Sequence, residues 1–136
     1  MPERLFRRGR LVTTAGVAVD ERGRYFLARR GPEGSQALRW EFPGGKCDQD
    51  GDERACLVRE FDEELSLPIE VLQEIGSVDF QHKTTKLVLV AYRIRMLSET
   101  YHLHVHTDAA WIERDRLLDL DLAESDRVLI ETCILT

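Results

Sequence analysis

A loop with two consecutive glycines that leads into an unusually acidic helix restricts the fold of this chain more than any other feature. The loop is Pro43-Gly44-Gly45, and its glycines allow close approach of the backbone to a ligand. The helix is predicted from about Asp52, its N-cap, to Leu65, with Pro68 ending it. Four glutamates fall in one stripe along this helix: Glu53, Glu60, Glu63 and Glu64.

This concentration of carboxylates is unfavourable for a helix on its own. Like charges three or four positions apart repel by about 0.2–0.5 kcal/mol per pair. Glu63 and Glu64 also lie in the last turn, where the helix dipole disfavours anions. Arg59, one turn before Glu63, compensates part of this cost, and a divalent cation would compensate the rest. The stripe therefore indicates either a metal site or a solvated helix face.

Size and charge narrow the class of protein. A chain of 136 residues corresponds to one domain, residues 1–136, and is large enough for a hydrophobic core. The net charge of −6 argues against nucleic acid or an anionic membrane as the main partner, whereas a small anionic ligand fits if a metal inverts the local field. We see no targeting or membrane-spanning segment, and we expect a cytoplasmic protein.

The cysteines form no recognisable framework. Cys47, Cys56 and Cys133 are odd in number and widely spaced, without a Cys-x-x-Cys pair. This pattern indicates neither a disulfide framework nor a zinc site, so reduced thiols are the simpler interpretation.

Strand and helix patterns alternate along the chain and predict a mixed α/β sandwich. Leu11–Val19 and Tyr25–Ala28 form a predicted hairpin around Gly23, which we expect in the left-handed region. The rhythm of the acidic helix predicts an inner face of Ala55, Val58, Phe61 and Leu65. Further strands are expected at Ile69–Phe80, at Lys86–Met96 (the central one), at Tyr101–His106 and at Ala109–Ile112, and further helices at Glu113–Leu118 and Ser125–Ile134.

The run from Gly45 to Leu67 resembles the Nudix box, Gly-x5-Glu-x7-Arg-Glu-U-x-Glu-Glu-x-Gly-U, in which U is a bulky aliphatic residue. The residues in register are Gly45, Arg59, Glu60, Phe61, Glu63, Glu64 and Leu67. Two positions depart from the pattern. Its isolated Glu falls on Gly51, which is flanked by Asp50 and Asp52, and its later Gly falls on Ser66, which would need a left-handed conformation.

The resemblance extends from about Thr13 to Ile130 and implies an α/β/α sandwich with a mixed β-sheet. It also implies a site for Mg²⁺, with Mn²⁺ as an alternative, whose main ligands would be Glu60 and Glu64. The Gly45 carbonyl would complete this site, and Glu63 would add a ligand or a water-mediated contact. Glu60, Glu63 and Arg59 are the expected catalytic residues, with Arg59 orienting the carboxylates.

The general base is left open by the sequence. MutT-like relatives often place a Glu six residues before the Trp of a later strand, and the same count from Trp111 reaches Val105, which cannot accept a proton. His104, His106 and Asp108 lie nearby, and Glu63 could also assist. In the strand expected at residues 101–106, alternating histidines would share one face, which is either a zinc site or a polar, solvent-facing side.

Basic residues and one acid are candidates for contacts to the substrate. Lys46 follows the glycine loop and could touch phosphate, and Arg29 and Arg30 end a strand and could reach phosphate or base, unless they are merely solvated. Lys86, like Lys83, falls where the family often places a phosphate-contacting cation. Asp126 falls where MutT-like proteins place a residue that reads the base edge, although an Asp in a first helical turn is also favoured by the helix dipole.

The box and the segment Trp-Glu-Phe-Pro-Gly-Gly-Lys around its start together resemble the sequence pattern of MutT-like hydrolases. The expected reaction is metal-dependent hydrolysis of a (deoxy)nucleoside triphosphate, an oxidised purine or a CTP-like pyrimidine, to the monophosphate and pyrophosphate. Two alternatives remain: a non-catalytic nucleotide-binding or regulatory module, and a hydrolase of another nucleoside diphosphate-X compound. The expected partner is a small-molecule nucleotide, and the protein would be a monomer or a homodimer.

Overall fold

The computed structural model describes residues 4–136, and its longest elements are the strands of one antiparallel hairpin, β6 (Ile69–His82) and β7 (Thr85–Met96). On its other edge β7 pairs in parallel with β2 (Arg10–Val17), which also pairs antiparallel with β1 (Phe6–Arg7) and with β5 (Gly44–Lys46). Parallel and antiparallel neighbours therefore share one mixed sheet. The predicted central position of β7 is confirmed, because both of its edges are paired.

A smaller antiparallel sheet, in the order β4-β3-β8, joins β3 (Tyr25–Arg29), β4 (Trp40–Glu41) and β8 (Asp108–Ile112). The turn that connects β2 to β3 contains Gly23 with φ of +76°, as the sequence predicts, but β2 and β3 belong to different sheets, and the predicted hairpin is reduced to a single bridge between Val19 and Tyr25. The backbone N–H of Trp40 donates to the Asp121 carbonyl, and the N–H of Ala123 donates to the Trp40 carbonyl. This exchange fixes the start of the C-terminal helix beside β4.

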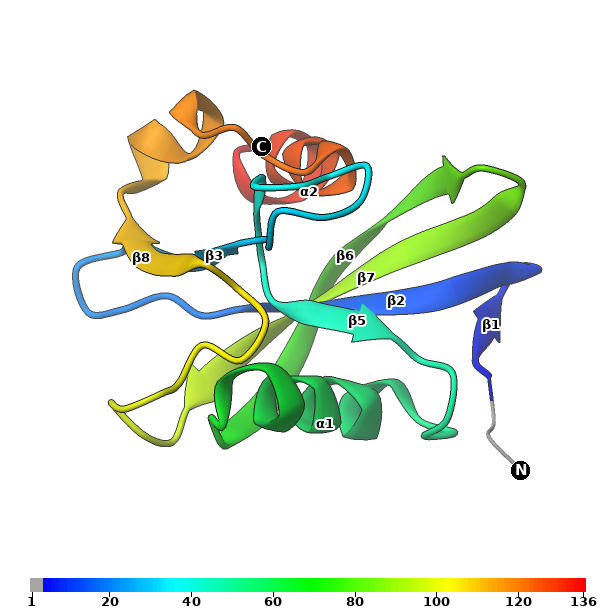
Figure 1. Cartoon of the computed structure of the whole chain (residues 1–136), viewed down its shortest axis with the longest axis horizontal. Helices are drawn as coiled ribbons and strands as arrows, with labels where there is room; N and C mark the ends of the chain where they lie inside the picture. The colour runs from blue at the N-terminus through cyan, green and yellow to red at the C-terminus, as the bar shows by residue number, and fades with distance from the viewer. Residues whose placement is uncertain (1–3) are drawn as a thin grey trace.

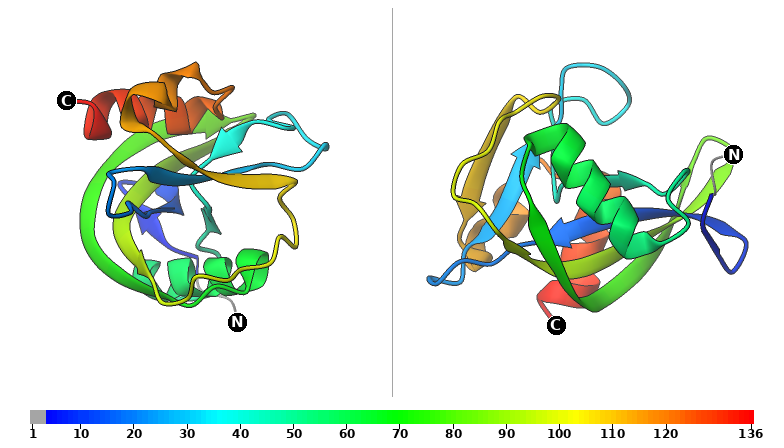
Figure 2. Two further views of the ribbon diagram at one scale, coloured as in Figure 1. Left: turned by 90° about the vertical axis from the view of Figure 1, so that its left-hand side faces the viewer. Right: turned by 90° about the horizontal axis from the view of Figure 1, so that it is seen from below.

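Helices cover both faces of the mixed sheet, with α1 (Glu53–Leu65) on one side and α2 (Glu124–Leu129), continued by the π-helical turn η2 (Ile130–Ile134), on the other (Figure 1). Figure 2 shows α1 crossing beneath the strands. A 3₁₀ helix, η1 (Arg114–Asp119), leads into α2. This arrangement confirms the α/β/α sandwich. Within residues 4–136, none of the helices is both long and apolar enough to cross a membrane.

The two faces of β7 contribute to two separate hydrophobic clusters, because successive strand side chains point to opposite sides. Val88, Val90, Tyr92 and Ile94 pack with the α1 residues Leu57, Phe61 and Leu65. Leu89 and Ala91 pack instead with Leu129 and Ile130 from the other helical layer. The mixed sheet thus holds α1 and α2 in fixed positions on opposite faces.

The acidic helix has the predicted limits but a different buried face. Asp52 is its N-cap, and its carboxylate accepts a hydrogen bond from the Arg54 N–H, 2.8 Å away. The predicted inner face was wrong for Ala55 and Val58, which are exposed, since Cys56 and Leu57 are buried with Phe61 and Leu65. Packing against the sheet fixes the rotation of the helix about its axis, and an apolar rhythm alone does not determine this rotation.

The segment 101–107 is an irregular loop, so the predicted strand Tyr101–His106 was wrong. Its backbone N–H groups do not form a sheet ladder: those of His102 and His104 donate to the carbonyls of Leu65 and Glu64, at 2.8 and 3.0 Å. The loop therefore caps the last turn of α1, which otherwise leaves its carbonyls without partners. The predicted common face of histidines is absent as a result, since His102 and His104 are exposed and His106 is buried.

Candidate active site

A cleft of about 600 Å³ brings residues from β2, β4, β5, α1 and the start of α2 to one place. Most of the predicted site residues line it: Arg30, Gly45, Lys46, Arg59, Glu60, Glu64 and Asp126. Three others lie outside its lining. Arg29 bonds the Thr107 hydroxyl at 3.0 Å, Lys86 is exposed on β7, and the Glu63 side chain is 56% exposed.

Both glycines of the loop are required, because the backbone there lies too close to neighbouring atoms to leave room for a Cβ. Gly44 has φ of +157°, and a Cβ on it would overlap the carbonyl oxygen of Thr14 on the neighbouring strand β2. A Cβ on Gly45 would lie 2.5 Å from the carboxyl carbon of Glu60. Glycine at both positions therefore allows β5 to pair with β2 while its backbone lies directly against a carboxylate of α1.

Glu64 is the most perturbed acid of the acidic stripe. Burial, followed by the nearby charges of Glu41 and Glu60, raises the pKa of Glu64 to about 9. Its buried Oε1 has no hydrogen-bond partner among the described residues. Burial also raises the pKa of Glu60, which lies one helical turn away. For neither carboxylate do the neighbouring positive charges offset the free-energy cost of burying a negative charge.

These residues fit a divalent cation. A buried carboxylate oxygen without a partner, beside a second carboxylate and the backbone of a glycine loop, provides the oxygen donors that Mg²⁺ and Mn²⁺ prefer. Among residues 4–136, no three His, Cys, Asp or Glu side chains are already gathered closely enough to hold a metal. Glu60 and Glu64 with the Gly45 carbonyl would form the core of such a site.

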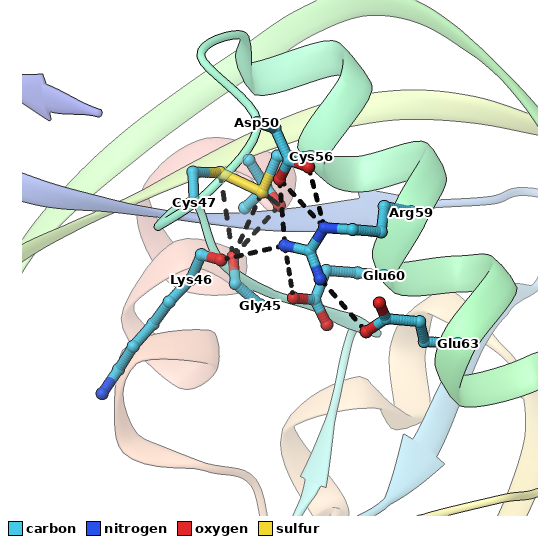
Figure 3. Close-up of polar contacts among 9 residues, drawn as sticks. Gly45, Lys46, Cys47, Asp50, Cys56, Arg59, Glu60 and Glu63 are labelled. Carbon is cyan, nitrogen blue, oxygen red and sulfur yellow. Dashed lines mark hydrogen bonds and ion pairs between the residues drawn. A yellow bond between two sulfur atoms is a disulfide. The ribbon is translucent and has the colours of Figure 1, made fainter. Parts of the chain in front are cut away.

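Arg59 connects the loop to the acidic stripe, as Figure 3 shows. Its guanidinium bonds both carboxylate oxygens of Asp50, at 2.8 and 2.9 Å, and pairs with Glu60 and Glu63, each at 3.1 Å. The hydrogen bonds that Arg59 donates to Asp50 raise the pKa of Arg59. Asp50 thus supplies a carboxylate next to the position where the box pattern has its isolated Glu, while Gly51 takes φ of +73°.

A disulfide joins Cys47 to Cys56, which corrects the expectation of reduced thiols (Figure 3). Their Cα atoms are 5.5 Å apart, and both side chains are fully buried between the end of β5 and α1. The expectation of reduced thiols failed because the spacing of cysteines along the chain does not show which of them the fold brings together. Cys133 is the free thiol, and the bond closes a ring that contains Asp50.

The other departure from the box pattern, Ser66, takes the left-handed conformation that the pattern requires, with φ of 49° and ψ of 41°. Its backbone N–H donates to the Asp62 carbonyl and closes the helix. Its hydroxyl bonds Nε2 of His104 at 2.7 Å. This side-chain bond compensates part of the conformational cost that a non-glycine residue has in this region.

Glu53, the first member of the stripe, belongs to a separate network. Its carboxylate bonds Arg7 at 2.6 Å and the Tyr92 hydroxyl at 2.7 Å. Burial and this bond raise the pKa of Tyr92 to about 12. Glu53 therefore ties α1 to the mixed sheet and does not line the cleft.

At the far end of the cleft, Asp126 is buried and accepts a hydrogen bond from the backbone N–H of Phe42, at 3.0 Å. Burial and the charge of Glu41 raise the pKa of Asp126 well above its usual range. Arg30 bonds Glu41 at 2.9 Å, and Lys46 has an exposed position on β5. The cleft therefore has an acidic end beside α1, cationic groups along it and a buried carboxyl group at α2.

Glu41 was not singled out by the sequence reasoning. It directly precedes the Phe-Pro-Gly-Gly run, and this proximity to the glycine loop was the available signal. Val105, by contrast, is 56% exposed and lines only a smaller hollow behind Glu41, whereas the neighbouring His106 points inward and contacts Glu41.

A mixed sheet between two helical layers, with a glycine loop against an acidic helix, defines a Nudix-type domain. Residues 9–133 match the NUDIX domain, and the chain belongs to this family. The CTP pyrophosphohydrolase of Escherichia coli strain K12 is 29% identical over 122 residues, which cover 90% of each chain. An 8-oxo-dGTP diphosphatase of Proteus vulgaris is 32% identical over 85 residues, covering 60% of this chain and 76% of that protein.

Solved structures of MutT proteins share this fold. The crystal structure of a MutT protein from Methanosarcina mazei Go1 superposes with a TM-score of 0.79 at 21% identity, over 96% of this chain and 91% of that one. This likeness confirms the predicted fold class.

Proposed function

We propose that this Nudix protein hydrolyses a nucleoside triphosphate to the monophosphate and pyrophosphate with the help of a divalent cation. The observation that carries this proposal is the arrangement of the cleft. One hollow is lined by the carboxylates of Glu60 and Glu64, the cations Arg30 and Lys46, and the buried Asp126, and these groups suit a metal, the phosphates and a base. The names of the Escherichia coli and Proteus vulgaris relatives support the same reaction class.

Each residue of the acidic end has a role that follows from its contacts. Glu60 and Glu64, with the Gly45 carbonyl, would hold Mg²⁺ or Mn²⁺, and the bound cation would clamp the phosphates, neutralise developing charge and lower the pKa of water. Arg59 keeps Glu60 and Glu63 oriented through bonds of 3.1 Å to each. Glu63, half exposed at the rim, would contribute a carboxylate from the solvent side. Lys46 would contact phosphate as a point charge.

The base end favours recognition by Asp126. An ionised carboxylate accepts hydrogen bonds from an exocyclic amine, as cytosine presents, whereas a protonated carboxyl group can also donate one. Burial raises the pKa of Asp126 and so favours its protonated form. It can therefore donate to a ring nitrogen or carbonyl and accept with its other oxygen. Both a CTP-like pyrimidine and an oxidised purine match this pattern.

A substrate panel tests the proposal. The purified protein is incubated with Mg²⁺ or Mn²⁺ and with CTP, dCTP, 8-oxo-dGTP, dGTP, ADP-ribose and NADH, and the products are identified by mass spectrometry with pyrophosphate detection. We expect pyrophosphate and a monophosphate from a cytosine or oxidised guanine nucleotide. Glu64→Gln should lower turnover at least 100-fold, whereas Glu131→Gln, on the exposed face of η2, should not.

The two alternatives give different results in the same panel. A non-catalytic module would bind a metal–nucleotide complex and leave it intact for hours, which calorimetry followed by mass spectrometry would show. A hydrolase of another nucleoside diphosphate-X compound would release two monophosphate products from ADP-ribose or NADH and no pyrophosphate. Either outcome would overturn the proposed reaction.

A further inference from the structure

The loop 101–107 reaches the candidate active site through His106. The histidine side chain is only 2% exposed, although both of its sequence neighbours, Val105 and Thr107, are exposed. Its Nε2 lies 2.9 Å from Oε2 of Glu41. Because a carboxylate oxygen can only accept, Nε2–H of His106 is the donor.

A guanidinium holds the other oxygen of the same carboxylate. Arg30 Nη1 donates to Oε1 of Glu41 at 2.9 Å. The backbone of Glu41 is fixed as well, because β4 pairs with β3 through the partners Ala28 and Glu41. With one donor on each oxygen and a side chain only 14% exposed, the Glu41 carboxylate is held in one orientation.

Glu41 lies between the two ends of the cleft. The N–H of the next residue, Phe42, donates to Asp126 at the base end, 3.0 Å away. It lines the main cleft together with Glu64, and both also line a hollow of about 210 Å³ on the side where His106 lies. The Glu41 carboxylate therefore shares both hollows with Glu64, and its orientation changes the charge that faces Glu64.

The loop is anchored on both sides of His106. Upstream, the N–H of His104 donates to the Glu64 carbonyl at 3.0 Å, and downstream the N–H of Thr107 donates to the Arg29 carbonyl at 2.9 Å. These bonds tie the loop to α1, which carries Glu64, and to the last residue of β3, which Arg30 directly follows. His106 is thus placed by main-chain contacts and has little freedom to leave Glu41.

From these contacts we propose that His106 is a positioning residue for the reaction. His106 holds the Glu41 carboxylate beside Glu64, and it does so from a loop in which position 105 is Val and not an acid. The inference rests on the proposed hydrolysis. His106 acts through Glu41 and does not contact the nucleotide. Without the imidazole, the Glu41 carboxylate would lose one of its two donors and rotate, so the site would bind substrate but turn it over more slowly.

Kinetics of substitutions at His106 test this inference. His106→Leu fills a similar volume without a donor, and we expect kcat to fall about tenfold while KM for the nucleotide stays within twofold. His106→Gln carries an amide N–H near the position of Nε2 and should recover most of kcat. His102→Leu, an exposed histidine on the same loop, is the matched control and should behave as the wild type. Equal kcat for His106→Leu and the wild type would overturn the inference.

A spectroscopic readout separates this inference from the proposed function. In ¹H–¹⁵N spectra of the imidazoles, the wild type should show a protonated His106 Nε2 whose signal shifts in Glu41→Gln and not in Glu70→Gln, an exposed control on β6. A signal unaffected by Glu41→Gln would show that the pair does not form. A wild-type protein without turnover on any nucleotide would overturn the proposed function and the catalytic role of His106, while the spectrum still reports the bond.

Discussion

Reduction of the Cys47–Cys56 disulfide should destabilise the protein by an amount that the size of the ring predicts. The bond joins residues nine positions apart and closes a ring of about 10 residues, for which the chain-entropy relation gives about 2.7 kcal/mol at 25 °C. An unfolding entropy of about 2.1 cal/mol/K per residue amounts to ~290 cal/mol/K for 136 residues. The unfolding midpoint should therefore fall by about 9 °C.

Thermal unfolding followed by circular dichroism, with and without a phosphine reductant, measures this shift. Thiol titration of the unfolded protein should find one thiol before reduction and three after it, since Cys133 is free. Cys133→Ser should keep the shift, and the double variant Cys47→Ser, Cys56→Ser should lose its response to the reductant. Midpoints within about 2 °C of each other at three titrated thiols would refute the reasoning, because the ring would then not restrict the unfolded chain.

Three further predictions concern the cleft. For the metal-free protein, the free energy of unfolding should fall as pH rises from about 4.5, the pKa of Glu in the unfolded chain, to about 9. The reason is that Glu64 keeps its proton to higher pH in the folded protein than in the unfolded chain. Urea titrations at several pH values should show a smaller fall for Glu64→Gln and in the presence of Mg²⁺. Asp50→Asn should weaken the bidentate contact to Arg59 and cost about 1.5–3 kcal/mol in urea unfolding, whereas Asp62→Asn, exposed on α1, should cost less than about 0.5 kcal/mol. Asp126→Asn keeps an acceptor for the Phe42 N–H, so the fold should persist, and the ratio of kcat/KM for cytosine and oxidised guanine nucleotides should change at least tenfold; an unchanged ratio would remove Asp126 from base recognition.

Features fixed by short-range chemistry could be predicted from the sequence. The limits of α1 follow from an N-cap aspartate and a proline, and the turn between β2 and β3 follows from Gly23. The central position of β7 follows from its continuous apolar run. In each case the residues that decide the structure lie within a few positions of it.

Features fixed by distant contacts could not be predicted in this way. Leu103 and Val105 alternate with histidines, a pattern typical of a strand. In the structure, backbone N–H groups of this loop donate instead to carbonyls at the end of α1. The disulfide depends on how β5 and α1 pack, and the pair of Glu41 and His106 joins residues 65 positions apart. Asp50 pairs with Arg59 although it lies one position from the pattern's acid, whereas Asp52, on the other side of Gly51, is the N-cap of α1.

The loop 101–107 also sets where this protein can tolerate sequence change. It holds the last turn of α1 with backbone N–H groups, and a backbone donor is present whatever non-proline side chain the position carries. Replacements of exposed residues such as Leu103 and Val105 should therefore be neutral during natural drift or directed evolution. Insertions or deletions between His102 and His106 should be eliminated, because they shift the donors out of line with the carbonyls of Glu64 and Leu65.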